Sequence, residues 1–182
     1  SRQPAQQDNS AQLREEAVKV AKDADLVLFI GGNNREIETE GSDRSNIMLQ
    51  GGQDELVKAL AEANPNLVTV LVAAAPVDLN VVEAYSPTIV VSWFNGSQGG
   101  NALADVLTGK ISPSGKLPFT YPKYVNSLHT YDFKVSEKRE MIDGAYNYDA
   151  KMDVQWSFGD GLSYTTFEYS DLIVDKNTFR KG

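Results

Sequence analysis

Cysteine is absent from this chain, and only one histidine, His129, occurs among its 182 residues. The lack of cysteine excludes disulfide bonds and catalysis by a thiol. A single histidine excludes a histidine-rich zinc site and argues against a Ser-His-Asp triad. His129 lies in a tyrosine-rich stretch without an evident partner, so we expect a structural or surface role for it. No apolar run approaches the length of a membrane span, and a membrane is therefore not an expected partner.

Basic residues are outnumbered by acidic ones, 17 Lys and Arg against 25 Asp and Glu, which gives a formal net charge of −8. Nucleic-acid binding depends on cations that neutralise phosphates, so nucleic acid is not an expected partner either. Hydrophobic residues make up 41% and charged residues 23% of the chain, as is ordinary for a globular protein. The length suits one domain with a sizeable core, or one domain and part of another.

Helix and strand patterns alternate as far as residue 107. Apolar spacing predicts helices over residues 11–23, 53–63, 78–84 and 101–107, and apolar, β-branched runs predict strands over residues 25–30, 67–74 and 88–93. Alternation with short connections predicts an α/β fold, a mostly parallel sheet flanked by helices in a flavodoxin-like α/β sandwich. Three strands are few for such a sheet, so part of the domain is expected outside this chain. Residues 1–10 are interpreted as a disordered or trimmed tail.

The pattern changes after Gly109. Three prolines within residues 112–122 predict an extended crossing, so the α/β domain is assigned to residues 11–122. Residues 123–161, without clear periodicity, are assigned to a long ordered loop and linker. Residues 162–174 alternate like an antiparallel strand, and residues 162–182 are expected to begin a β-sandwich domain that is cut off. Trp156 and Tyr164 are expected to pack at that junction.

An acidic loop, residues 32–44, directly follows the first predicted strand. Three carboxylates alternate in it, at Glu36, Glu38 and Glu40. Loops at the carboxyl ends of parallel strands line the ligand crevice of an open α/β sheet. A carboxyl crowded by others keeps its proton more readily, which a general acid requires. The alternative interpretation is a solvated acidic edge.

Four separated segments resemble motifs of glycoside hydrolase family 3, in the family's order and over roughly residues 11 to 172. Residues 38–44 are similar to E-x-E-G-x-D-R, and residues 96–109 to G-x-x-G-G-x-A-x-A-D-V-L-x-G. Residues 113–122 are similar to P-S-G-K-L-P-x-T-x-P, and residues 158–167 to F-G-x-G-L-S-Y-T-x-F. We therefore expect this chain to be the second domain of a multi-domain enzyme of that family.

The resemblance implies a retaining, exo-acting β-glycosidase, a β-glucosidase that removes terminal non-reducing β-D-glucosyl residues, with β-xylosides as the alternative substrate. A TIM-like barrel, absent from this chain, would carry the nucleophile, and a fibronectin-III-like domain would follow residue 161. Retention requires the two carboxyls ~5 Å apart across the scissile bond, so the isolated chain is expected to be inactive. No cofactor or metal is implied, and a periplasmic or secreted location is expected.

The resemblance also assigns roles to residues. Glu38 matches the first glutamate of E-x-E-G-x-D-R and is expected to be the general acid/base, with Glu40 second and Glu36 third. Asp43 and Arg44 are expected to hold the loop through charge-assisted hydrogen bonds.

Two further pairs are candidates. Trp93 and Phe94 end the third strand, where an aromatic ring could stack on a sugar or belong to the core. Gly99 and Gly100 open a helix, where tight packing is the preferred role over an anion site. The strand followed by Gly31-Gly32 lacks the spacing of a nucleotide loop.

Two other functions stay open at this point. The chain could be a sugar-binding or interaction module that has lost chemistry. It could also be a flavodoxin-like domain for a phosphate-bearing ligand, although the acidic loop would repel an anion.

Overall fold

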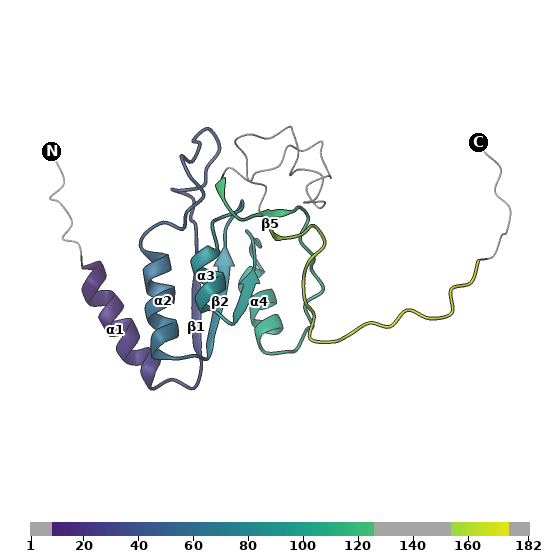
Figure 1. The fold of residues 1–182 in the computed structure, drawn as a ribbon, viewed down its shortest axis with the longest axis horizontal. Helices are drawn as coiled ribbons and strands as arrows, with labels where there is room; N and C mark the ends of the chain where they lie inside the picture. The colour runs from purple at the N-terminus through teal and green to yellow at the C-terminus, as the bar shows by residue number, and fades with distance from the viewer. Residues whose placement is uncertain (1–8, 126–153, 175–182) are drawn as a thin grey trace, which may run out of the picture.

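The computed structural model describes residues 9–125 and 154–174 (Figure 1). Along the chain the elements are α1 (Ser10–Lys22), β1 (Val27–Gly32), α2 (Gln53–Ala63), β2 (Leu67–Val72), α3 (Asn80–Tyr85), β3 (Thr88–Val91), α4 (Gly99–Leu107), β4 (Tyr121–Pro122) and β5 (Val154–Trp156). Strands β1, β2 and β3 form one sheet in that order, and β4 pairs with β5. The predicted α/β fold is confirmed.

All pairs within the three-stranded sheet are parallel, with Val27 opposite Leu67 and Val68 opposite Thr88. The carboxyl ends of the three strands therefore lie at one edge. This edge carries the acidic loop after β1 and the aromatic pair after β3. Strand β1 ends two residues later than the pattern predicted, because Gly31 and Gly32 continue the pairing with β2 as far as Val72.

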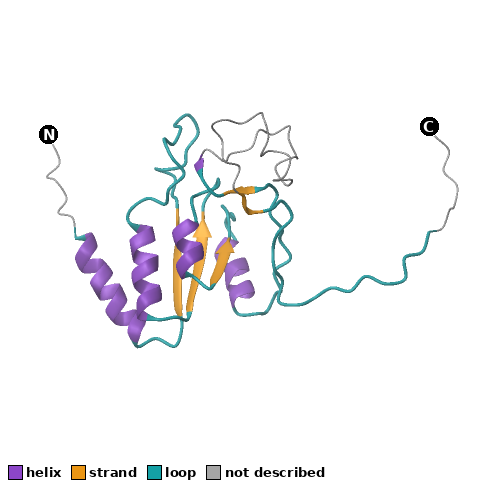
Figure 2. Cartoon of the chain, viewed as in Figure 1, coloured by secondary structure: helices purple, strands orange, loops and turns teal. Residues whose placement is uncertain are grey.

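The core lies between the sheet and the helices α2 and α3. Figure 2 shows α1 and α2 on one side of the strands and α4 on the other. Buried side chains from both layers meet there: Phe29, Leu67 and Leu71 from the sheet, and Val57, Leu60 and Val82 from the helices. Each buried side chain of this size contributes roughly 1.5–3 kcal/mol. On the opposite face of β1, Leu28 and Ile30 stay exposed.

A row of aromatic rings joins the sheet to the crossing over residues 112–122. Ring centroids are 5.5 Å apart for Trp93 and Phe119, 6.0 Å for Phe119 and Tyr121, and 5.3 Å for Tyr121 and Trp156. Trp156 also lies opposite Tyr121 in the antiparallel β4–β5 pair. The sequence analysis placed residues 154–156 in a long loop and missed this pairing. Strand β4 has two residues and β5 three, too few to show a periodic pattern.

Residues 162–174 form no strand, in contrast to the prediction. The segment runs away from the sheet (Figure 1), with Tyr169 and Leu172 more than nine-tenths exposed. A strand needs a partner for its backbone groups, and no described residue supplies one here. Tyr164 donates a hydrogen bond to the Val106 carbonyl at 2.8 Å. The assignment to a fibronectin-III-like domain stays a prediction, and His129 lies outside the described residues.

Two negative findings apply to residues 9–125 and 154–174. Their helices are too short or too polar to cross a bilayer. Their Asp and Glu side chains form no group of three or more that could hold a metal ion.

Candidate active site

The acidic loop leaves the sheet at Gly32, at the carboxyl edge (Figure 1). Gly32 has φ 126°, and a Cβ there would clash with the backbone of Val72. Only glycine lets β1 run this close to β2 in that conformation. The next residue, Asn33, donates its backbone N–H to the Val72 carbonyl at 2.9 Å, so the loop is bound to the sheet where it starts.

Glu38 is an anchor within this loop, with a side chain only 6% exposed. Its Oε1 accepts a hydrogen bond from Asn33 Nδ2 at 3.1 Å and lies 3.2 Å from Arg44 Nη1. Its Oε2 accepts the backbone N–H of Ala74 at 2.5 Å. Two hydrogen bonds and one ion pair therefore occupy both oxygens, and the bond to Ala74 fastens the loop to the segment after β2.

That segment, residues 74–77, forms a ledge beneath the loop. Arg44 Nη2 donates to the Pro76 carbonyl at 3.2 Å. The Tyr121 hydroxyl accepts the Val77 N–H and donates to the Val77 carbonyl, both at 3.0 Å. Burial raises the pKa of Tyr121 to about 12. Residues 74–77 therefore contact Glu38 and Arg44 of the loop and also the buried Tyr121.

Glu40 occupies the tip of the loop. Thr39 and Ser42 pair across a tight turn, and the Ser42 N–H donates to the Thr39 carbonyl at 3.4 Å. Gly41, third in this turn, has φ 79°, which a type II turn requires and glycine supplies. The Glu40 side chain is exposed, and no described residue makes a hydrogen bond or ion pair with it.

The three alternating glutamates thus have different environments, which their spacing did not reveal. Glu38 is buried among donors, whereas Glu36 and Glu40 are exposed. Arg44 contacts Glu38 and the ledge. Its neighbour Asp43 is exposed, and within the described residues its carboxylate has no partner.

The aromatic pair after β3 is also divided. Trp93 is half-buried against Phe119 and has a left-handed backbone with φ 54°, which is rare for a bulky residue. Strain of this kind often accompanies functional sites. Phe94 is 50% exposed. Of the two rings, that of Phe94 is the one open to a ligand.

The two glycines at the start of α4 differ as well. A Cβ on Gly99 would clash with the Asn95 carboxamide, while a Cβ on Gly100 would have open space. Close packing against Asn95 therefore explains why residue 99 is glycine, whereas no steric contact requires glycine at position 100.

One carboxyl near the base of the loop was not singled out from the sequence. Asp54, in the first turn of α2, has an Oδ1 that is buried without a hydrogen-bond partner among the described residues. Burial raises the pKa of Asp54 above its usual value, and the charges of Asp78 and Glu55 raise it further.

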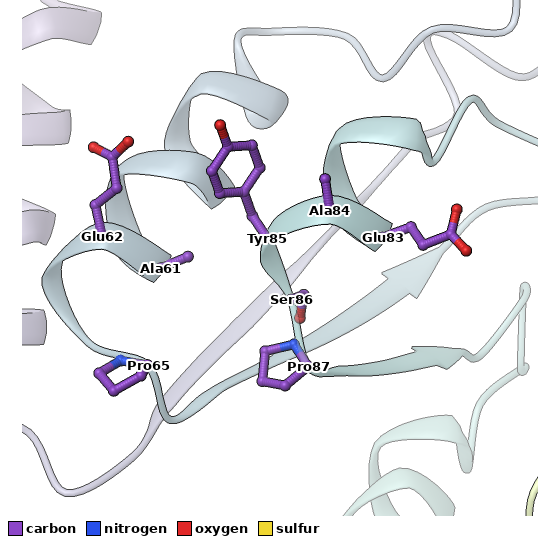
Figure 3. A pocket seen from close by; sticks show the side chains of 8 residues that line it. All are labelled: Ala61, Glu62, Pro65, Glu83, Ala84, Tyr85, Ser86 and Pro87. Carbon is purple, nitrogen blue, oxygen red and sulfur yellow. The ribbon is translucent and has the colours of Figure 1, made fainter.

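An open groove of about 380 Å³ lies elsewhere (Figure 3), lined by Ala61, Glu62, Pro65, Glu83, Ala84, Tyr85, Ser86 and Pro87. Pro65 lies two residues before β2 and Pro87 directly before β3, so the groove is at the amino edge of the sheet. Ligands of open α/β sheets bind at the carboxyl edge. The acidic loop, rather than this groove, is therefore the candidate site.

Comparison with known proteins gives one consistent family. A model described as glycosyl hydrolase family 3 C-terminal domain matches residues 3–164. The chain is 41% identical over 179 residues to beta-glucosidase BoGH3A of Bacteroides ovatus, covering 91% of this chain and 24% of that protein. It is 36% identical over 174 residues to a periplasmic beta-glucosidase of Salmonella typhimurium, covering 92% of this chain and 23% of that protein.

The fold has matching solved structures. The beta-glucosidase of Kluyveromyces marxianus, crystallised with glucose, superposes with a TM-score of 0.74 and 32% identity, over 90% of this chain and 20% of that one. The chain thus spans a quarter or less of the length of these relatives, 24% of the Bacteroides protein and 20% of the Kluyveromyces one.

Proposed function

The chain belongs to glycosyl hydrolase family 3, and we propose that it is the second domain of a retaining β-glycosidase to which it supplies the general acid/base. The proposed substrates are terminal non-reducing β-D-glucosyl residues, since the relatives are named as beta-glucosidases. β-Xylosides are the alternative. The nucleophile would come from a barrel domain of the same protein. The whole relatives are about four times as long as this chain.

The acid/base is assigned to Glu40, the second candidate from the sequence. A general acid must bring its carboxyl within hydrogen-bonding reach of the glycosidic oxygen. The observation that carries the assignment is the contrast between Glu40 and Glu38. Glu40, at the loop tip, is exposed and has no partner among the described residues, whereas the Glu38 side chain is 6% exposed and is held by two hydrogen-bond donors and an ion pair. Glu38 would have to release those donors before it could reach a substrate.

Glu40 acts as an acid in the first step of retaining hydrolysis and as a base in the second. Protonated Glu40 gives its proton to the leaving-group oxygen while the nucleophile of the barrel domain forms a bond to the anomeric carbon. Glu40, now a carboxylate, then removes a proton from the water that attacks the same carbon, and the nucleophile leaves. Glu38 and Arg44 hold the loop during both steps.

Two finer features belong to the proposal. Phe94, exposed at the same edge of the sheet, would stack on the sugar or aryl group that leaves, and Trp93 would hold the strand end against the core. A periplasmic or secreted location is proposed because one relative is named periplasmic.

The test uses the complete protein and two aryl β-glucosides. Glu40→Gln should lower kcat/KM for phenyl β-glucoside by about 10²- to 10⁴-fold, since this leaving group needs a proton. Dinitrophenolate is a leaving group that departs without a proton, so the first step with dinitrophenyl β-glucoside should change little. Its slowed second step should recover with azide, an anionic nucleophile that needs no base.

Glu38→Gln is the paired variant. We expect it to lower kcat/KM for phenyl β-glucoside much less than Glu40→Gln does, because it weakens the anchor of the loop but leaves the proton donor in place. The leaving-group pattern in Glu38→Gln and not in Glu40→Gln would return the role to Glu38, the first choice from the sequence. Wild-type protein that binds glucosides without hydrolysing them would instead favour a sugar-binding module.

A further inference from the structure

Gln53, the first residue of α2, uses its side-chain amide to bind the end of β1. The Gly32 N–H donates to Gln53 Oε1 at 2.7 Å, and Gln53 Nε2 donates to the Gly32 carbonyl at 2.8 Å. The second hydrogen of Nε2 goes to the Gln50 carbonyl, also at 2.8 Å. The amide thus makes with Gly32 the reciprocal pair that a neighbouring strand would make, on the edge of β1 away from β2.

The backbone around this pair is shaped to admit it. A Cβ on Gly31 would clash with Gln53 Oε1 and with the Phe29 ring, so only glycine leaves room for the amide. On the other side of the pair, Gly51 and Gly52 have φ 74° and 73° and lead the chain into α2. The Gly31-Gly32 pair, which lacks the spacing of a nucleotide-binding loop, therefore has a steric role: it leaves room for the Gln53 amide and for the close approach of β2.

The pair fixes the point from which the acidic loop departs. Gly32 is held by Gln53 on one side, and the following residue, Asn33, is held by the Val72 carbonyl on the other. Asn33 is 5% exposed, and its side chain donates to Glu38. A shift of the Gly32 peptide would therefore move Asn33 and Glu38, and with them Glu40 two residues further on.

We propose that Gln53 is a positioning residue for the general acid/base: its amide sets the direction in which the acidic loop leaves the sheet, and hence the place of the Glu40 carboxyl. Gln53 touches no reacting atom in this scheme. The inference rests on the proposed function, because it concerns the glutamate that this function requires.

Misplacement has a signature that general destabilisation lacks. A shift of about 1 Å in a catalytic group can cost ~100-fold in rate, but only in steps that need that group. Gln53→Met keeps the side-chain length and removes all three hydrogen bonds. Gln53→Glu keeps the acceptor for Gly32 N–H but turns an anionic oxygen towards two carbonyls.

In the complete protein, both variants should lower kcat/KM for phenyl β-glucoside by about 10- to 100-fold and for dinitrophenyl β-glucoside by less than about threefold. The ratio of the two values does not depend on how much of the protein is folded, so partial unfolding cannot imitate the result. Gln50→Met is the matched control, because among the described residues the Gln50 side chain bonds within its own exposed loop, to Asn46 and Met48. It should leave the ratio unchanged.

The outcomes separate the two proposals when Glu40→Gln is measured alongside. An equal loss on both substrates, or no loss, in the Gln53 variants would overturn the positioning role while the effect of Glu40→Gln remained. A Glu40→Gln variant without leaving-group dependence would overturn the proposed function, and with it this inference.

Discussion

Residues 32–38 of the acidic loop, its base, are bound on three sides, whereas the side chains of residues 40–43, its tip, make no hydrogen bond or ion pair within the described part of the chain. The base is held by Gln53, by the Val72 carbonyl and by the ledge at residues 74–77. Among the described residues, the tip is held by its own turn, in which Thr39 pairs with Ser42. A rigid base with an unpartnered tip suits a carboxyl that must act on something outside this domain.

The largest effect on stability is expected from Arg44, which joins the base to the ledge. Arg44→Met would leave the carboxylate of Glu38 buried without its cation, which costs about 3 kcal/mol. Urea denaturation of the chain would measure this cost. Lys110→Met is the control: Lys110 pairs with Asp105 at 2.9 Å, but its side chain is 70% exposed, so its loss should cost less than about 1 kcal/mol.

A double variant would sharpen this result. Glu38→Gln removes the charge that Arg44 compensates, so Arg44→Met should cost less in that background than in the wild type. Purely additive effects would mean that Arg44 stabilises the loop through Pro76 alone, and the ion pair would lose its place in the base.

Tyr121 comes next, because it supports the ledge from below. Tyr121→Phe would leave the N–H and carbonyl of Val77 buried without partners, at a cost of about 1–3 kcal/mol near pH 7. The raised pKa adds a pH dependence. The hydroxyl keeps its proton in the folded chain up to about 12, so the wild type loses stability as pH rises from ~10 towards that value. The gap between wild type and Tyr121→Phe in urea midpoint should narrow over this range, and a constant gap would contradict it.

Asp54 should have a smaller effect, visible as a slope. Its pKa is raised in the folded chain, so its contribution to stability is present below the unfolded value of ~3.8 and is lost as pH rises through the folded pKa. Asp54→Asn removes this loss. Its melting temperature relative to wild type should therefore increase from pH 4 to pH 8. A difference that stays flat or falls would show that the favourable charge at the helix N-terminus outweighs burial.

How far the sequence could predict the base and the tip depends on how local each feature is. The helix over residues 53–63 followed from apolar spacing alone. The difference between Glu38 and Glu40 did not, since the Ala74 N–H that binds Glu38 is 36 residues away. The Gln53–Gly32 pair spans 21 residues, and the β4–β5 pair joins segments that have no period. Periodicity predicts elements, but partners are set by packing between elements.

The smallest effect is expected from the exposed acidic side chains of the loop, those of the tip and Glu36 in the base, and it is the most direct test of the comparison. Asp43→Asn and Glu36→Gln change exposed charges without partners among the described residues, so each should alter the urea-derived unfolding free energy by less than about 0.5 kcal/mol. Glu40→Gln should be equally silent in this measurement while it abolishes proton transfer in the complete protein. If Glu40→Gln instead destabilised the fold as Arg44→Met does, the tip would be a second anchor of the loop. The general acid/base would then have to be another carboxyl of the loop.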